Sequence, residues 1–259
     1  MSVVSKAMIG LAYRQWRLML SSPQNLMLPI LEPTLYLLIF GQIMTTIIPS
    51  VQYAGRHWDY LSFVLPGILA MAAWQRGVHA GTPIYVDKVT GELESLFGLP
   101  IPRGLILVAN AVSMCFQTIV YSGTILAIAH VMGLSILITP YRVCLGLAVI
   151  IVFTVLISMT FSALCTLIVS QETFNVISNL VILPIVFTSS VFYPLAAAPF
   201  WIRVIASVNP VNAAAGLLRT IFLQDPFTLS AILMPLVVSL AVTALVSIIS
   251  MAIFARALR

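Results

Sequence analysis

The chain has 259 residues, of which 61% are hydrophobic and only 7% are charged, with a formal net charge of +5. Soluble domains carry about 25% charged residues, so this composition excludes a water-soluble fold. The twelve Lys and Arg residues are spread along the chain rather than gathered in a basic stripe, which excludes nucleic acid as the expected partner.

Long uncharged runs divide the sequence, and they indicate membrane spans. A bilayer core of about 30 Å requires about 20 helical residues, and the runs contain 23 to 38 residues each: 33–55, 104–141, 143–171, 173–202 and 226–255. We therefore predict an all-α polytopic membrane protein, a single transmembrane domain over residues 1–259. Its six predicted spans are 26–48, 60–83, 104–131, 143–169, 176–193 and 228–254.

Residues 3–20 precede the first span and form a predicted amphipathic helix. At 100° per residue, Lys6, Arg14 and Arg17 fall within an arc of about 80°, opposite a set of apolar residues. This pattern is typical of a helix that lies in the membrane interface against anionic headgroups. An amphipathic helix packed against other protein is the alternative.

The second span is the weakest of the six by hydropathy, because it contains Arg76 and His79. It is retained because residues 61–74 are apolar and the chain must return across the membrane. Arg76 and His79 lie one helical turn apart, and they either line a substrate path or serve structural contacts.

Prolines interrupt the apolar stretch 194–226, at positions 194, 199, 210 and 226. The pieces between them hold about 9 and 12 helical residues, which rise only about 13 and 18 Å, too short to cross the bilayer. We expect non-spanning interfacial or re-entrant helices, with Trp201 at the interface and with Arg203 and Arg219 able to extend their charges to it.

The distribution of Lys and Arg residues predicts the orientation of this topology in the membrane. Six spans place both termini on one face, which carries seven Lys and Arg residues (6, 14, 17, 88, 103, 256 and 259) against four on the other face (56, 142, 203 and 219). Cytoplasmic segments are enriched in Lys and Arg. Both termini are therefore predicted to be cytoplasmic, and the 194–226 stretch extracytoplasmic.

Several strings resemble the ABC-2 type permeases, which include daunorubicin, nodulation-factor and polysaccharide exporters. They are LEPTLYLLIFG at 31–41, FVLPGILAM at 63–71, TGELESL at 90–96 with Pro100 and Pro102, and VFYPL at 191–195 with Pro199, Trp201, Asn209, Pro210 and Arg219. The resemblance runs through the whole chain in order and departs most in the second span. It implies a permease subunit in the bacterial plasma membrane, paired with a second permease copy and carrying separate cytoplasmic ATPase subunits.

The segment 87–103 is the predicted contact with the ATPase. Thr90 is placed to cap a short helix with Glu92 and Glu94 near its positive N-terminal end. Leu93, Leu96 and Phe97 then share one helical face. The resemblance implies that this is the coupling helix, and a loop helix resting on lipid headgroups is the alternative.

Glu32 lies near the start of the first span between Pro29 and Pro33. Ionisable groups inside a membrane are functional candidates by default. Glu32 is either a polar site at the cytoplasmic entrance of the substrate path or at the dimer seam, where Arg76 and His79 are further candidates, or it is structural, as the partner of an arginine such as Arg76 or at a capped helix kink.

The sequence lacks the motifs expected of an ATP-hydrolysing chain. A Walker A loop requires Gly-Lys-Ser/Thr, and the only lysines, Lys6 and Lys88, follow Ser5 and Asp87. No metalloprotease or nucleophile-elbow motif is present in the sequence, so we expect no enzyme and no cofactor on this chain, with ATP and Mg²⁺ on the partner. A secondary transporter or channel without an ATPase is the alternative function. The expected substrate is amphipathic, lipid-linked or polysaccharide, and it moves outward.

Overall fold

The computed structural model describes residues 34–92, 104–168, 170–225 and 229–257, together with positions 10, 13, 14, 17, 27, 31, 95 and 98. In chain order these form a π-helical turn η1 (Tyr36–Phe40), α3 (Gly41–Ile47), strands β1 (Ser50–Tyr53) and β2 (Arg56–Asp59), α4 (Tyr60–His79), α5 (Gly81–Val89), α7 (Gly104–Val131) and α8 (Pro140–Thr166). The second half continues with α9 (Gln171–Phe187), a 3₁₀ turn η2 (Leu195–Ala197), α10 (Phe200–Val208), α11 (Pro210–Leu223) and α12 (Leu229–Ala257). The amphipathic helix predicted over 3–20 lies almost entirely outside the described residues.

The described part of the chain is a bundle of long apolar helices, as predicted. Three stretches are both long and apolar enough to cross a membrane: Tyr60–Val89, Gly104–Val131 and Pro140–Thr166. Helix α12 has 29 residues and is about 43 Å long. The protein is therefore a multi-pass helical membrane protein, and the count of six spans stays a prediction.

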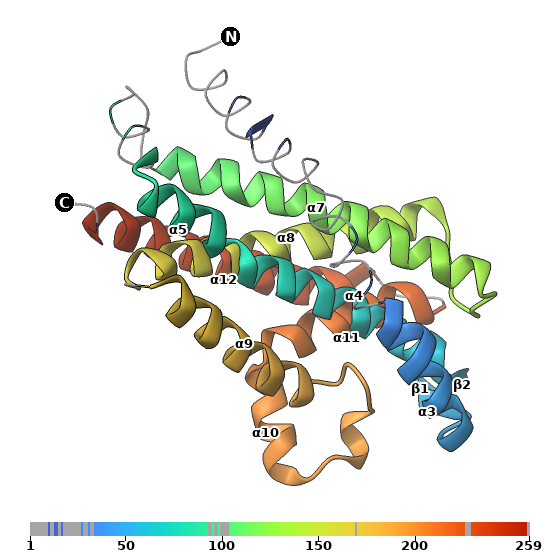
Figure 1. Cartoon of the computed structure of the whole chain (residues 1–259). Helices are drawn as coiled ribbons and strands as arrows, with labels where there is room; N and C mark the ends of the chain where they lie inside the picture. The colour runs from blue at the N-terminus through green and yellow to red at the C-terminus, as the bar shows by residue number, and fades with distance from the viewer. Residues whose placement is uncertain are drawn as a thin grey trace.

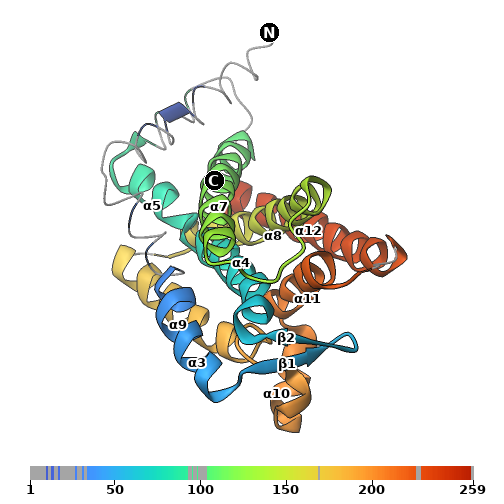
Figure 2. The same ribbon diagram turned by 90° about the vertical axis from the view of Figure 1, so that its right-hand side faces the viewer.

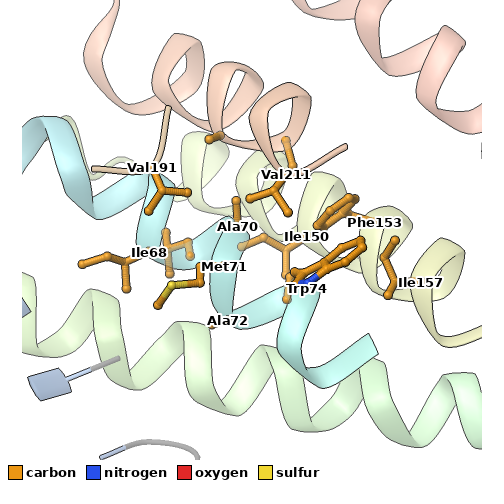
Figure 3. Close-up of a cluster of buried hydrophobic side chains, with 14 of the residues drawn as sticks. Ile68, Ala70, Met71, Ala72, Trp74, Ile150, Phe153, Ile157, Val191 and Val211 are labelled. Atoms are coloured by element: carbon orange, nitrogen blue, oxygen red, sulfur yellow. The ribbon is translucent and has the colours of Figure 1, made fainter. Parts of the chain in front are cut away.

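Helix α4 is the centre of the bundle. It packs against α7, α8, α9 and α11, and Figure 2 shows it with α3 and α9 on one side and α8, α11 and α12 on the other. Every residue from Tyr60 to Trp74 is buried. The Trp74 ring lies 6.3 Å from the Phe153 ring (Figure 3) and 6.1 Å from the Phe161 ring. The span that is weakest by hydropathy is thus the most enclosed, because protein rather than lipid surrounds it.

Helices α7 and α8 meet through small polar side chains. Thr154, Ser158, Ser162 and Thr166 recur every four residues on α8 and are all buried. The Thr154 hydroxyl donates to the Thr118 hydroxyl across the interface at 3.3 Å. Small and hydroxylated residues let membrane helices approach closely and bond across the contact, so this stripe defines how the two helices pair.

Two elements differ from the predicted topology. Strands β1 and β2 form an antiparallel hairpin whose turn, Ala54 and Gly55, has positive φ at both residues, 52° and 77°; the all-α prediction missed this hairpin. Helix α9 covers Gln171–Phe187 rather than 176–193. Residues 188–194 after it are not helical, so the predicted end of that span is wrong.

The bundle has two distinct ends, which Figure 1 shows at its left and right. The C-terminus and α5 lie at the left, and the β1–β2 hairpin lies at the right. At the hairpin end, Arg142 is buried and its guanidinium donates to the carbonyls of Ile221 and Gln224 at 2.6 and 2.8 Å, and pairs with Asp225 at 3.1 Å. It thereby ties the start of α8 to the end of α11.

Candidate functional site

The first candidate site is the break between α4 and α5 at Ala80. The Asn110 amide on α7 donates to the Ala80 carbonyl at 2.7 Å and to the Ser162 hydroxyl at 2.9 Å. The Ser162 hydroxyl in turn donates to the Ala80 carbonyl at 3.2 Å. A break in a membrane helix is stable when side chains satisfy the freed backbone groups, so three helices share this joint.

Glycines on both sides of the break bring α4 and α5 close to their neighbours. A Cβ atom at Gly77 would lie 2.5 Å from the Ile157 Cβ, and one at Gly81 would lie 2.4 Å from the Phe174 ring. These contacts leave no room for a larger residue. The joint is therefore fixed by packing as well as by the Asn110 hydrogen bonds.

The far end of α5 is anchored by two adjacent charged residues. Arg14 forms ion pairs with Asp87 and Glu92, and the Asp87 side chain is nearly buried. The Lys88 ammonium donates to the Thr166 carbonyl at the end of α8, at 3.0 Å, where cations are favoured by the helix dipole. Helix α5 is thus joined to α8 and to the N-terminal segment.

The predicted coupling residues continue directly from this anchored end. Thr90 is the C-cap of α5 and its hydroxyl donates to the Val86 carbonyl at 3.0 Å, so it ends a helix that the sequence did not predict. Glu92 is the exposed partner of Arg14. Leu93, Glu94, Leu96 and Phe97 lie outside the described residues, and their coupling role stays a prediction.

The charged residues inside the spans have different surroundings. The Arg76 guanidinium lies over the Tyr121 ring of α7, with its Cζ atom 5.3 Å from the ring centre, which is within the range of a cation–π contact. His79 is half-buried one turn further along α4. Glu32 lies outside the described residues, so its pairing with Arg76 stays a prediction.

Arg219 corrects the expectation that it extends to the interface. It is 2% exposed, and its guanidinium lies over the Phe63 ring, 3.9 Å from the centroid. It donates to the Phe63 carbonyl at 3.1 Å, the Ser190 hydroxyl at 2.7 Å and the Val191 carbonyl at 3.2 Å, and also to the Ser190 carbonyl. Arg219 therefore joins α11 to α4 and to residues 188–194.

Asn209 and Pro210 make the junction between α10 and α11. The Asn209 carbonyl oxygen of the side chain caps α11 by accepting from the Val211 amide at 2.9 Å, and Pro210 occupies the first turn, where its missing N–H costs nothing. The Asn209 amide group donates to the Ile185 carbonyl at 2.7 Å. This junction therefore also holds the end of α9.

The proline spacing predicted the two short helices well. Helix α10 has 9 residues and α11 has 14. Trp201 on α10 is exposed together with Phe200, as expected for interfacial aromatic residues. Helix α11 packs instead against α4 and α8 and buries most of its length.

These sites are built from structural contacts. Most of the contacts above join one helix to another or to a neighbouring segment through a carbonyl, hydroxyl, amide or charged group, while Thr90 and Asn209 cap α5 and α11. Within the described ranges, no three His, Cys, Asp or Glu side chains form a metal-binding group. Asn110, Ser162 and Ser190 take part in these contacts, and sequence reasoning did not single them out.

This architecture defines the class of protein as a multi-pass membrane protein with a central helix, α4. One end of α4 meets α7 and α8 at the polar joint around Ala80, and the other end is joined through Arg219 to residues 190 and 191. A family comparison goes further. The family model described as ABC-2 type transporter matches residues 7–223. The chain therefore belongs to the ABC-2 type transporter family and is a transport permease subunit.

Curated relatives agree with this assignment. The chain is 28% identical over 211 residues to a putative transport permease ycf38 of Pyropia yezoensis, covering 81% of this chain and 70% of that protein. It is 26% identical over 203 residues to the daunorubicin resistance ABC transporter permease protein DrrB1 of Streptomyces coeruleorubidus, covering 77% and 70%. It is 25% identical over 195 residues to the inner membrane transport permease YadH of Escherichia coli K12, covering 73% and 71%.

Proposed function

We propose that this chain is the permease of a bacterial ABC exporter, located in the inner membrane with both termini in the cytoplasm. A separate ATPase subunit binds ATP and Mg²⁺ and drives the outward movement of an amphipathic, lipid-linked or polysaccharide substrate. The family match over residues 7–223 carries this proposal. The named relatives, a daunorubicin resistance permease and an inner membrane permease, support the direction and the membrane.

The arrangement of α5 supports a mechanical link to such an ATPase. Its end is joined to α8 by Lys88 and to Arg14 by Asp87. Its beginning is joined to α7 and α8 at Ala80. A force applied to the segment after Thr90 therefore acts on three helices together rather than bending one loop.

The exposed face of α9 supports pairing with a second permease copy. Val176, Leu180, Leu183 and Phe187 follow one another at helical spacing and are all exposed, between 54% and 70%. Helix α9 packs on α4 and α5 with its other face. An apolar face of this kind is suited to lipid or to a partner helix, and the proposed homodimer places a second copy there.

Copurification with the ATPase tests the proposal. The permease and its candidate ATPase are expressed together, and the tagged permease is purified in detergent. We expect the ATPase to copurify and to hydrolyse ATP, and the permease alone to show no hydrolysis. Turnover by the pure lone chain, or failure of any ATPase to bind it, contradicts the proposal and favours a secondary transporter or channel.

A double substitution, Leu96→Asp with Phe97→Asp, locates the contact. Loss of a buried Leu or Phe contact costs about 2–5 kcal/mol, so we expect the ATPase to dissociate while the permease stays inserted. Val131→Asp is the matched control, because Val131 is an 86% exposed apolar residue at the opposite end of α7. If the double variant retains and stimulates the ATPase as the control does, coupling lies outside the 90–97 segment.

A further inference from the structure

Residues 188–194, here called the exit segment, are an irregular stretch enclosed by helices. Ser189 and Val191 are 0% exposed, and Ser190 and Phe192 are 7% exposed. No helix or strand includes these four residues. Irregular backbone at membrane depth is stable only where other groups satisfy its carbonyls and amides, so the contacts of this segment decide whether it stays in place.

Side chains of α4 and α11 bind three successive carbonyls of the exit segment. Arg219 donates to the carbonyls of Ser190 and Val191. The Tyr60 hydroxyl donates to the Phe192 carbonyl at 2.8 Å. The segment is thus held from two helices by long side chains, in addition to its own short-range bonds, in which the Ser189 hydroxyl donates to the Val186 carbonyl and accepts from the Val191 amide.

The exit segment also lies directly on the backbone of α4. A Cβ atom at Gly67 would lie 2.8 Å from both the Cα and the carbonyl oxygen of Val191. Figure 3 shows Val191 above α4 near Ile68 of that helix, with Val211 of α11 on the same side of α4. The segment therefore lies in direct contact with α4 at this level of the bundle.

The buried charge of Arg219 is satisfied by neutral acceptors. Its hydrogen-bond acceptors are carbonyls and one hydroxyl, and no carboxylate of the described residues forms an ion pair with it. Three of its four acceptors belong to residues 190 and 191. If the segment leaves, the guanidinium loses these three acceptors, and only water can replace them.

We propose that Arg219 and Tyr60 are positioning residues that hold the exit segment closed over the extracytoplasmic end of the transport path, and that the segment is released in each ATP-driven cycle. The inference rests on the proposed function, because an ATP-driven cycle exists only if the chain works with an ATPase. Release exposes Arg219 to water, so opening of the segment and hydration of the exit occur together.

The rate of cysteine labelling in the exit segment tests this proposal. The Ser189 hydroxyl bonds to the Val186 carbonyl and to the Val191 amide, and because every variant carries the same cysteine, the loss of these bonds is common to all of them. Ser189→Cys is close in size to the native residue, does not remove an Arg219 acceptor, and places a thiol at a position that is 0% exposed. It is introduced after replacement of Cys115, Cys144 and Cys165 by serine. The permease–ATPase complex in lipid nanodiscs is then treated with a membrane-impermeant maleimide, with and without Mg-ATP.

We expect slow labelling without nucleotide and faster labelling during hydrolysis. Without nucleotide, Tyr60→Phe removes one buried hydrogen bond and should accelerate labelling about threefold to tenfold. Arg219→Gln should accelerate it more than tenfold, and Arg219→Lys should fall between, because lysine keeps the charge but lacks the guanidinium fork. Arg203→Gln is the control, since Arg203 is an exposed arginine on the adjacent α10, and it should leave the rate unchanged.

Three outcomes overturn the inference. Equal labelling of Arg219→Gln and Arg203→Gln without nucleotide shows that Arg219 does not hold the segment. Labelling that is unaffected by Mg-ATP while ATP is hydrolysed shows that the segment stays in place throughout the cycle. Labelling of intact cells only after permeabilisation shows that the segment does not face the outside.

The controls keep this inference separate from the proposed function. If no ATPase binds, the proposed function fails, while the comparison without nucleotide still decides the positioning role. If Arg219→Gln does not fold, judged by loss of a monodisperse complex, Tyr60→Phe decides it, because that substitution keeps the ring and removes one hydroxyl.

Discussion

Gly67→Ala is the substitution whose effect follows most directly from the geometry of α4. The added methyl group would lie 2.8 Å from the Cα and the carbonyl oxygen of Val191. To reach an ordinary contact of 3.4 Å, the Val191 backbone would have to withdraw by about 0.6 Å. Its carbonyl is held by Arg219 and the following carbonyl by Tyr60, so the backbone cannot withdraw without loss of hydrogen bonds.

A matched glycine separates this clash from the general effect of alanine in a helix. Alanine is favoured over glycine in helices by about 1 kcal/mol, whereas overpacking costs about 1–3 kcal/mol. Gly216 on α11 is half-buried, and a Cβ atom there meets nothing within 4 Å. The helix preference is common to both substitutions, so Gly67→Ala should be less stable than Gly216→Ala by about 1–3 kcal/mol.

Thermal denaturation of the purified protein in detergent measures this difference. For a chain of this size, 1 kcal/mol corresponds to about 2–4 °C, so the midpoint of Gly67→Ala should lie about 2–12 °C below that of Gly216→Ala at one scan rate. Gly67→Ala should also accelerate labelling of Ser189→Cys. Equal midpoints and equal labelling for the two variants would refute the close approach of Val191 to α4.

Two further predictions concern the end of the bundle at which α5 and the C-terminus lie. Reporter fusions after residue 90 and at the C-terminus should both report a cytoplasmic location, as the distribution of Lys and Arg predicts, and a periplasmic signal from either contradicts the topology. Arg14→Asp and Asp87→Arg should each weaken ATPase stimulation. Each leaves a charge facing a like charge at a pair in which Asp87 is nearly buried, and because Arg14 is partly exposed the cost is about 1–3 kcal/mol. The double variant restores the pair with its charges exchanged but leaves a carboxylate facing the exposed Glu92, so it should recover stimulation in part. No recovery would show that the pair does not position α5.

The long helices were predictable because charge and proline mark their limits. Helix α7 covers Gly104–Val131, the predicted range, because the uncharged run begins directly after Arg103. The prolines at 199 and 210 likewise predicted the starts of α10 and α11. Both signals are local, so a single sequence is enough to read them.

The end of α9 was not predictable, because hydropathy does not distinguish lipid from protein surroundings. Val191, Phe192 and Tyr193 continue the apolar run of α9 and were assigned to the span. In the structure the helix ends at Phe187, and the following carbonyls bind Arg219 and Tyr60. Those partners lie 28 to 132 residues away, so no local pattern predicts them.

The polar residues of the joints left a weaker signal in the sequence. The spacing of Thr154, Ser158, Ser162 and Thr166 by four is visible in the sequence and is typical of a close helix contact. Which helix they meet, and that Asn110 joins Ser162 to Ala80, follows only from the packing of α4 against α7 and α8. Arg219 was assigned to the interface because a lone arginine in an apolar stretch is usually solvated at its charged end.

Helix α4 connects the joint at Ala80 with the contacts of Arg219. At one end Asn110 and Ser162 bind the Ala80 carbonyl, and at the other Arg219 binds the Phe63 carbonyl. Between them the helix is buried against α8 and α11 with close contacts at Gly67 and Gly77. Closely packed helices move as units rather than deforming continuously. We therefore expect a displacement of α5 to reach the exit segment through α4, and there to change which groups satisfy the buried charge of Arg219.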